Sequence, residues 1–162
     1  MTLYICSICV LIVIIVISYF IVKYNNNNVT TMSFRETMDL VGLPIVTFRN
    51  NNKRFNFLLD TGASTSIINK SILSELVYKD TKMGGTVFGM EGNQVEAPLV
   101  YIELTYKDKQ YDDTFQCVDM TTAFDNVKQE YGVTIHGILS SHFFEKYKYI
   151  LDFKDLIAYS KK

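Results

Sequence analysis

The residues best placed to do chemistry form a short acidic turn after an apolar run. Residues 57–59 are Phe-Leu-Leu, and Asp60, Thr61, Gly62 and Ala63 follow them. A carboxylate at the end of a buried strand lies in a low dielectric, which disfavours its charged form. Gly62 lets backbone N–H groups approach that carboxylate, and the Thr61 hydroxyl can bond to a neighbouring loop. The pattern predicts an acid–base site, and a tight turn in which Asp60 bonds its own backbone is the alternative.

Acid–base hydrolysis by carboxylates requires two of them. Two carboxylates side by side cannot both ionise, so they share a proton, and one then acts as general base on a water while the other acts as general acid. The sequence contains one Asp-Thr-Gly and no Asp-Ser-Gly. Asp152 is followed by Phe153, which favours a structural role for this aspartate. The partner of Asp60 is therefore expected from a second copy of the chain, as a homodimer.

These residues resemble the retropepsin-like aspartic proteases, the family of retroviral proteases and their single-domain bacterial relatives. The family pattern is an apolar strand with Asp-Thr-Gly-Ala, a Gly-rich flap hairpin, and an apolar pair with Gly before a short C-terminal helix. Residues 60–63 match the first part, residues 84–95 fit the second, and residues 138–144 fit the third. The resemblance covers about residues 43–159, and the segment around Asp60 is its specific part.

The resemblance implies an aspartic endopeptidase that acts on peptide or protein substrates without a metal or other cofactor. Asp60 is then catalytic, and Thr61, Gly62 and Ala63 support the active site. The tip of the flap is expected to close over the peptide and exclude water. The flap residues that this assigns to substrate binding are Gly89, Met90, Glu91 and Gly92.

One residue departs from the family pattern. Ser140 follows the apolar pair at the position where relatives usually have glycine. This departure favours an alternative function, a non-proteolytic peptide-binding module that is tethered to a membrane and uses the same groove. Asp60 favours the enzyme, because peptide binding alone does not require a pair of buried carboxylates.

Two histidines are weaker candidates for chemistry. Ser140-Ser141-His142 could suggest a serine hydrolase, but residues 137–141 are Gly-Ile-Leu-Ser-Ser and do not match Gly-x-Ser-x-Gly, and adjacent residues rarely pair as nucleophile and base. His136 lies in an apolar segment and is expected to be a hydrogen-bonded core residue. The two histidines and Cys117 lack the spacing of a metal site.

The elements that must position Asp60 are mostly strands. Residues 43–48 and 54–60 are separated by an Asn-rich turn and predict a hairpin, and alternation of apolar residues predicts further strands. We expect an all-β, retropepsin-like barrel with short helices. The other expected strands cover residues 86–89, 95–106, 111–118, 149–153 and 156–159, and the expected helices cover residues 69–78, 123–131 and 141–147.

The chain divides into three segments. Residues 1–22 carry no charge and are long enough for a transmembrane helix, and they lack the basic start and the cleavage site of a signal peptide, which is the competing interpretation. Residues 23–32 form an Asn-rich tether without periodicity. Residues 33–162 are expected to form the protease domain.

The charges and cysteines of the sequence bear on the orientation of the domain, on its partners and on its disulfides. Lys23 and Arg35 follow the apolar segment and no basic residue precedes it, which favours a domain that faces the cytoplasm. The formal net charge of -1 and the absence of a basic cluster argue against nucleic acid as a partner. Cys117 is the only cysteine outside the apolar segment, so the domain is expected to contain no disulfide.

Overall fold

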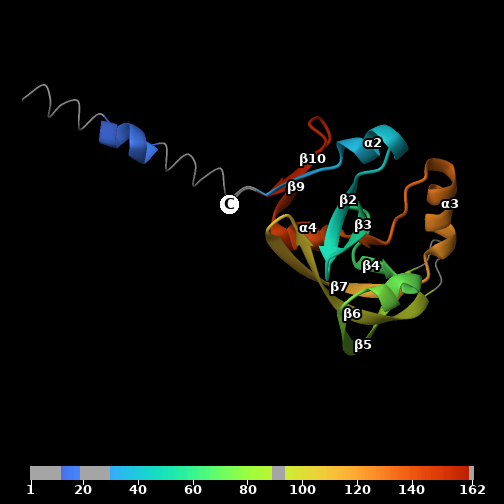
Figure 1. Ribbon diagram of the computed structural model, residues 1–162. Helices are drawn as coiled ribbons and strands as arrows, with labels where there is room; N and C mark the ends of the chain where they lie inside the picture. The colour runs from blue at the N-terminus through green and yellow to red at the C-terminus, as the bar shows by residue number, and fades with distance from the viewer. Residues whose placement is uncertain (1–11, 19–29, 89–93, 161–162) are drawn as a thin grey trace, which may run out of the picture.

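The computed structural model describes residues 12–18, 30–88 and 94–160, and in these residues strands dominate and the helices are short (Figure 1). The strands are β1 (Thr31–Ser33), β2 (Ile45–Asn50), β3 (Lys53–Leu59), β4 (Ser66–Asn69), β5 (Tyr78–Phe88), β6 (Gln94–Tyr106), β7 (Lys109–Val118), β8 (Gly137–Leu139), β9 (Tyr149–Asp152) and β10 (Ile157–Ser160). The helices are α2 (Arg35–Val41), the 3-10 helix η1 (Lys70–Glu75), α3 (Thr121–Tyr131) and α4 (Ser141–Tyr147).

Seven strands form one sheet that closes on itself. Its order is β2-β3-β8-β4-β7-β6-β5, and β2 also pairs with β6. The pairing of Arg49 with Thr105 therefore completes a barrel, as the sequence predicts. In this barrel β8 lies between β3, to which it is parallel, and β4, to which it is antiparallel.

A second, three-stranded sheet joins the two ends of the domain. Its order is β1-β10-β9, and Thr31 pairs with Tyr159. Met32 is only 1% exposed and belongs to the core. β1 therefore begins at Thr31, two residues before the predicted domain boundary at residue 33.

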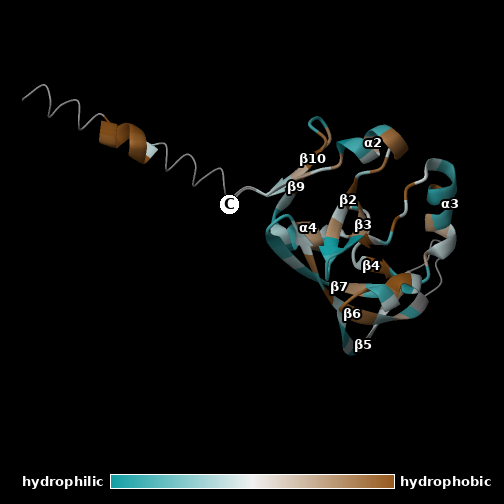
Figure 2. Ribbon diagram, in the orientation of Figure 1, coloured by the Kyte–Doolittle hydropathy of each residue, from teal (hydrophilic) through white to brown (hydrophobic). Residues whose placement is uncertain are grey.

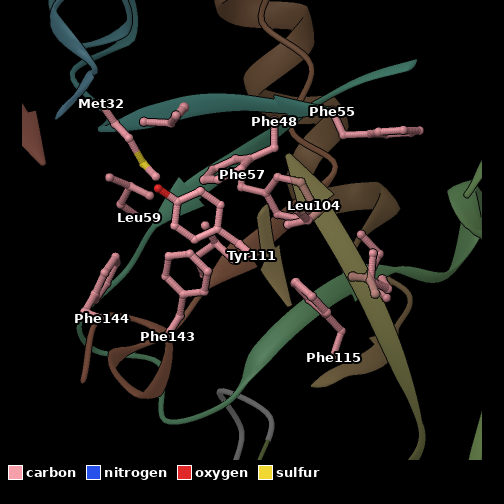
Figure 3. Close-up of a cluster of buried hydrophobic side chains, with 14 of the residues drawn as sticks. Met32, Phe48, Phe55, Phe57, Leu59, Leu104, Tyr111, Phe115, Phe143 and Phe144 are labelled. Carbon is pink, nitrogen blue, oxygen red and sulfur yellow. The ribbon is translucent and has the colours of Figure 1, made fainter. Parts of the chain in front are cut away.

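Aromatic side chains fill the barrel. Phe48, Phe57, Tyr111 and Phe143 come from three strands and from α4, and their rings meet at the centre of the core (Figure 3). The Phe48 ring meets those of Phe57 and Tyr111 edge to face, with centroids 5.8 and 5.7 Å apart. Such contacts add to the free energy of burial. They fix β3, whose last residue precedes Asp60, against the rest of the barrel.

Two of the three expected helices form where their end signals lie. α4 covers Ser141–Tyr147, as predicted. α3 ends at Gly132, which adopts a left-handed conformation with φ of 71°, as its expected position after the helix requires.

The helix expected for residues 69–78 is wrong in its second half. Asn69 does cap η1, but the chain is already extended at Leu76, and β5 begins at Tyr78. The buried side chain of Asn50 accepts a hydrogen bond from the Val77 N–H at 2.7 Å and donates one to the Val77 carbonyl at 2.9 Å. These bonds satisfy the backbone of Val77 in the extended conformation.

Only part of the predicted membrane anchor belongs to the described residues. Residues 12–18 form a helix that is almost entirely hydrophobic (Figure 2). Within the described ranges, no helix has both the length and the apolar character needed to cross a membrane. Residues 1–11 and 19–22 of the predicted anchor lie outside these ranges.

Candidate active site

Asp60 lies immediately after β3, where that strand runs parallel to β8. The register pairs Leu59 with Leu139, and the Asp60 N–H donates to the Leu139 carbonyl at 3.0 Å. Asp60 is partly exposed, in contrast to Leu59, which is 4% exposed. The backbone of Asp60 is therefore fixed to β8, while its side chain remains partly exposed.

Gly62 supports the Asp60 carboxylate directly. Its backbone N–H donates to Asp60 Oδ1 at 2.8 Å. A Cβ on Gly62 would lie 3.2 Å from the same oxygen, so a side chain there would crowd the carboxylate. The role predicted for Gly62, close approach of the backbone to the carboxylate, agrees with this geometry. Thr61 is exposed beside it.

Ala63 closes the turn and joins it to α4. Its N–H donates to the Asp60 carbonyl at 3.3 Å. Its own carbonyl accepts two hydrogen bonds from Ser141, one from the backbone N–H and one from the hydroxyl, both at 2.9 Å. The turn of residues 60–63 is thus fixed at its start by Leu139 and at its end by Ser141.

Ser140 lies between those two contacts and is fully buried. Its N–H donates to Ser66 Oγ at 3.2 Å, and its hydroxyl oxygen is also 3.2 Å from Ser66 Oγ. The Ser66 hydroxyl in turn donates to Asp113 Oδ2 at 2.6 Å. The Ser140 hydroxyl is thus accommodated in the core by polar partners.

These partners of Ser140 were not found from the sequence. Asp113 is separated by 47 residues from Ser66 and does not belong to any motif. The available signal was the position of Asp113 between Tyr111 and Phe115, where the alternation of the strand predicts an inward-facing side chain. A charged residue is seldom fully buried without a partner.

A family model described as aspartyl protease matches residues 46–143, more than half of the chain. The chain belongs to the aspartyl protease family. The matched segment contains Asp60, its supporting turn and the contacts with Ser140 and Ser141. The expected family is thereby confirmed, and a comparison with curated proteins gives no match.

Two solved structures are similar to this aspartyl protease family member. The EIAV protease in complex with the inhibitor HBY-793 is 22% identical, with a TM-score of 0.49, and the match covers 67% of this chain and 90% of that one. A retropepsin-like aspartic protease from Rickettsia conorii is 15% identical, with a TM-score of 0.48, and the match covers 82% of this chain and 90% of that one.

The predicted flap residues of this family member, Gly89, Met90, Glu91 and Gly92, lie outside the described residues. The two arms that lead to them are described. β5 and β6 pair antiparallel up to Phe88 and Gln94, with an irregularity between Asp80 and Gly84. Gly85 packs so closely that a Cβ there would lie 2.9 Å from the side-chain nitrogen of Gln116 on β7.

The weaker candidates have structural roles in the described part of the chain. His136 is partly buried, and its Nδ1 accepts the Asn56 N–H at 2.9 Å. Burial lowers the pKa of the His136 imidazole below its ordinary value. Asp152 Oδ1 accepts the N–H groups of Lys154 and Asp155 at 2.9 and 3.1 Å, as in a turn.

The segment Ser140-Ser141-His142 does not form a nucleophile and its base. Ser140 is fully buried, and the Ser141 hydroxyl is directed at Ala63. His142 Nδ1 instead faces Asp113 Oδ1, 3.7 Å away. In the described ranges no group of three His, Cys, Asp or Glu side chains is arranged to hold a metal ion.

Proposed function

We propose that the chain is an aspartic endopeptidase of the retropepsin type, which cleaves peptide bonds between the Asp60 carboxylates of two identical chains. The observation that carries this proposal is the position of Asp60, a partly exposed carboxylate directly after a buried strand. The Gly62 N–H orients this carboxylate at 2.8 Å, a bond that a tight turn without catalysis would also form. Membership of the aspartyl protease family supports the same chemistry.

The single Asp-Thr-Gly of the sequence supports the homodimer. Hydrolysis by this chemistry requires a second carboxylate close to the first, and the turn of Asp60 is partly exposed and offers the site for it. In this proposal the hydroxyl of the exposed Thr61 bonds to the corresponding turn of the second copy. The active site is then shared, and each chain contributes half of it.

The chemistry of the paired carboxylates needs no cofactor. One Asp60 carboxylate accepts a proton from a water, and the water oxygen forms a bond with the carbonyl carbon of the substrate. The carboxylic acid of the other Asp60 gives its proton to the substrate oxygen, and a gem-diol forms. Collapse of the gem-diol breaks the C–N bond: the nitrogen leaves with the proton of the first Asp60 carboxyl group, and the second Asp60 carboxylate takes a proton from a gem-diol hydroxyl, which restores the single shared proton.

We also propose that residues 1–22 anchor the enzyme in a membrane, with the catalytic domain on the cytoplasmic side. The uncharged composition of this segment supports the anchor. Lys23 and Arg35, which follow the segment, support the orientation. Confinement to the membrane would raise the effective concentration of the chains and favour their pairing.

The alternative function, a membrane-tethered peptide-binding module without proteolysis, rests on Ser140. This residue is buried with hydrogen bonds to Ser66 and leaves the contacts of Asp60 with Leu139 and Gly62 intact. Ser140 therefore gives little support to the peptide-binding module, and we favour the enzyme.

Digestion of a peptide library by the purified full-length chain in detergent tests the proposed function. We expect cleavage within peptides, identified by mass spectrometry, and loss of all cleavage in the Asp60→Asn variant with an unchanged circular dichroism spectrum. Asp125→Asn is the matched control, because Asp125 is exposed on α3 and should be neutral. Binding of peptides without cleavage by the wild-type chain would instead support the module.

A further inference from the structure

A buried polar cluster lies directly behind the catalytic turn. Ser66, Asp113 and Ser140 are 1%, 4% and 0% exposed. They come from the start of β4, from β7 and from the end of β8, so the cluster joins three strands of the barrel. Serine and aspartate are rarely buried to this extent, and a buried carboxylate costs free energy unless its oxygens accept hydrogen bonds.

The Asp113 carboxylate obtains those hydrogen bonds from defined donors. Asp113 Oδ2 accepts the Ser66 hydroxyl at 2.6 Å, and Oδ1 accepts the Thr114 N–H at 2.9 Å. Because the single hydroxyl proton of Ser66 is directed at Asp113, the lone pairs of Ser66 Oγ are turned toward Ser140, whose N–H donates to them at 3.2 Å. A network in which each member is satisfied specifies one arrangement of its parts.

The position of Ser140 determines the position of the catalytic turn. Its neighbours on either side make the contacts that hold the turn. The Leu139 carbonyl accepts from the Asp60 N–H, and the N–H and hydroxyl of Ser141 donate to the Ala63 carbonyl. Ser66 follows the same turn along the chain. The bond from Ser140 to Ser66 therefore closes a ring of contacts around residues 60–66, and Asp113 fixes the side chain of Ser66 that makes this bond.

We propose that Asp113 is a positioning residue of the active site, which acts through Ser66 and Ser140 on the turn that carries Asp60. This inference rests on the proposed function, because it assigns the effect to peptide hydrolysis by Asp60. The required property of Asp113 is a hydrogen bond to Ser66, which an amide at this position can also form. Displacement of catalytic groups by about 1 Å can lower the rate about 100-fold.

The test is steady-state kinetics of the full-length chain on one peptide selected from the library. Asp113→Leu removes the partner of Ser66 at similar size, and we expect kcat to fall about 10- to 100-fold with KM changed less than about 2-fold. Asp113→Asn should restore most of kcat. Ser66→Ala removes the donor of the same hydrogen bond and should lower kcat by the same factor. This second variant tests the proposal if Asp113→Leu does not fold.

A matched control separates positioning from loss of stability. Asn50 is 5% exposed, and its side chain makes three hydrogen bonds at the opposite end of the hairpin formed by β2 and β3. Both Asp113→Leu and Asn50→Ala should lower the thermal unfolding temperature, but Asn50→Ala should leave kcat unchanged. The double variant Ser66→Ala with Asp113→Leu should lose no more activity than either single variant, because both remove one interaction.

Three results would overturn the positioning role. These are a kcat within about 2-fold of wild type in folded Ser66→Ala, an Asp113→Asn variant as slow as Asp113→Leu, and losses that multiply in the double variant. Failure of the proposed function is distinguished by Asp60→Asn. Retained cleavage in Asp60→Asn refutes catalysis by Asp60. Loss of cleavage in Asp60→Asn, together with a wild-type kcat in Ser66→Ala, refutes only the role of Asp113.

Discussion

Gly137 faces the carbonyl oxygen of Ile67 across the pairing of β8 with β4. A Cβ on Gly137 would lie 2.6 Å from that oxygen and 2.8 Å from the Phe57 ring. Neither neighbour can move freely, because one is strand backbone and the other is a fully buried ring. The absence of a side chain at Gly137 allows β8 to enter between β3 and β4.

Gly137→Ala is therefore expected to destabilise the fold. Overpacking of this kind costs about 1–3 kcal/mol of unfolding free energy. Chemical denaturation of the full-length chain in detergent, followed by circular dichroism, measures the loss. Gly84→Ala is the matched control, because a Cβ on Gly84 would meet nothing within 4 Å. Equal stability of the two variants would contradict the close packing of β8.

Much of the framework could be predicted from the sequence, because its signals are local. The hairpin of β2 and β3 has an Asn-rich turn in which Asn51 and Asn52 both adopt positive φ. Both ends of α4 and the C-terminal end of α3 were also predicted, whereas α3 begins two residues earlier than expected, at Thr121. α2 was missed, since none of its residues is buried and it therefore lacks a strong apolar face. The extension of β5 back to Tyr78 was missed because it depends on bonds from the distant Asn50.

His136 is expected to make stability depend on pH. Burial lowers the pKa of this histidine below its ordinary value of 6.5. As the pH falls below 6.5, the unfolded chain binds a proton that the folded chain does not, so the unfolding free energy decreases until the pH reaches the folded-state pKa. The decrease is at most ~1.4 kcal/mol per pH unit, the limit for one proton.

Denaturation of wild type and His136→Gln between pH 7.5 and about 5 measures this contribution. The variant should show a shallower fall in unfolding free energy, since glutamine does not titrate. His142→Gln is the control, because this second histidine is 63% exposed at its side chain. The account of His136 is wrong if its variant and wild type lose stability in parallel.

Pairing of two chains at Asp60 is expected to make inactive chains inhibitory. With about a nine-fold excess of Asp60→Asn chains, the activity per wild-type chain should fall to about one tenth, as random pairing by mass action requires. Exchange is followed with peptide cleavage in detergent after incubation of the mixture. The control is the same excess of an unrelated single-pass protein. Undiminished activity after proven exchange would exclude the shared site.

The proposed anchor is tested by fractionation of cells that express the full-length chain. We expect the chain to remain with membranes through alkaline carbonate washing and to keep Met1 in its intact mass. Ile14→Lys with Val16→Lys is the control, since each charge near the centre of a span costs about 2.5–3.5 kcal/mol. A mature chain that begins between Lys23 and Val29 would identify the segment as a signal peptide.

The candidate site was predictable only where it is contiguous in the sequence. The segment from Asp60 to Ala63 could be recognised by its residue types and their spacing. The residues that fix it, among them Asp113 and Ser141, lie 53 and 81 positions after Asp60 and become neighbours only through the crossing of strands. Periodicity indicates which face of a strand is buried, and it does not indicate which strands lie side by side.

The early start of β1 limits how far the proteolytic domain can act from a membrane. If residues 1–22 span the bilayer and Thr31 already belongs to the folded domain, eight residues remain between them. Eight fully extended residues reach at most about 29 Å. The active site would then lie no farther from the lipid than this length plus the width of the domain, so substrates close to the membrane surface would be favoured.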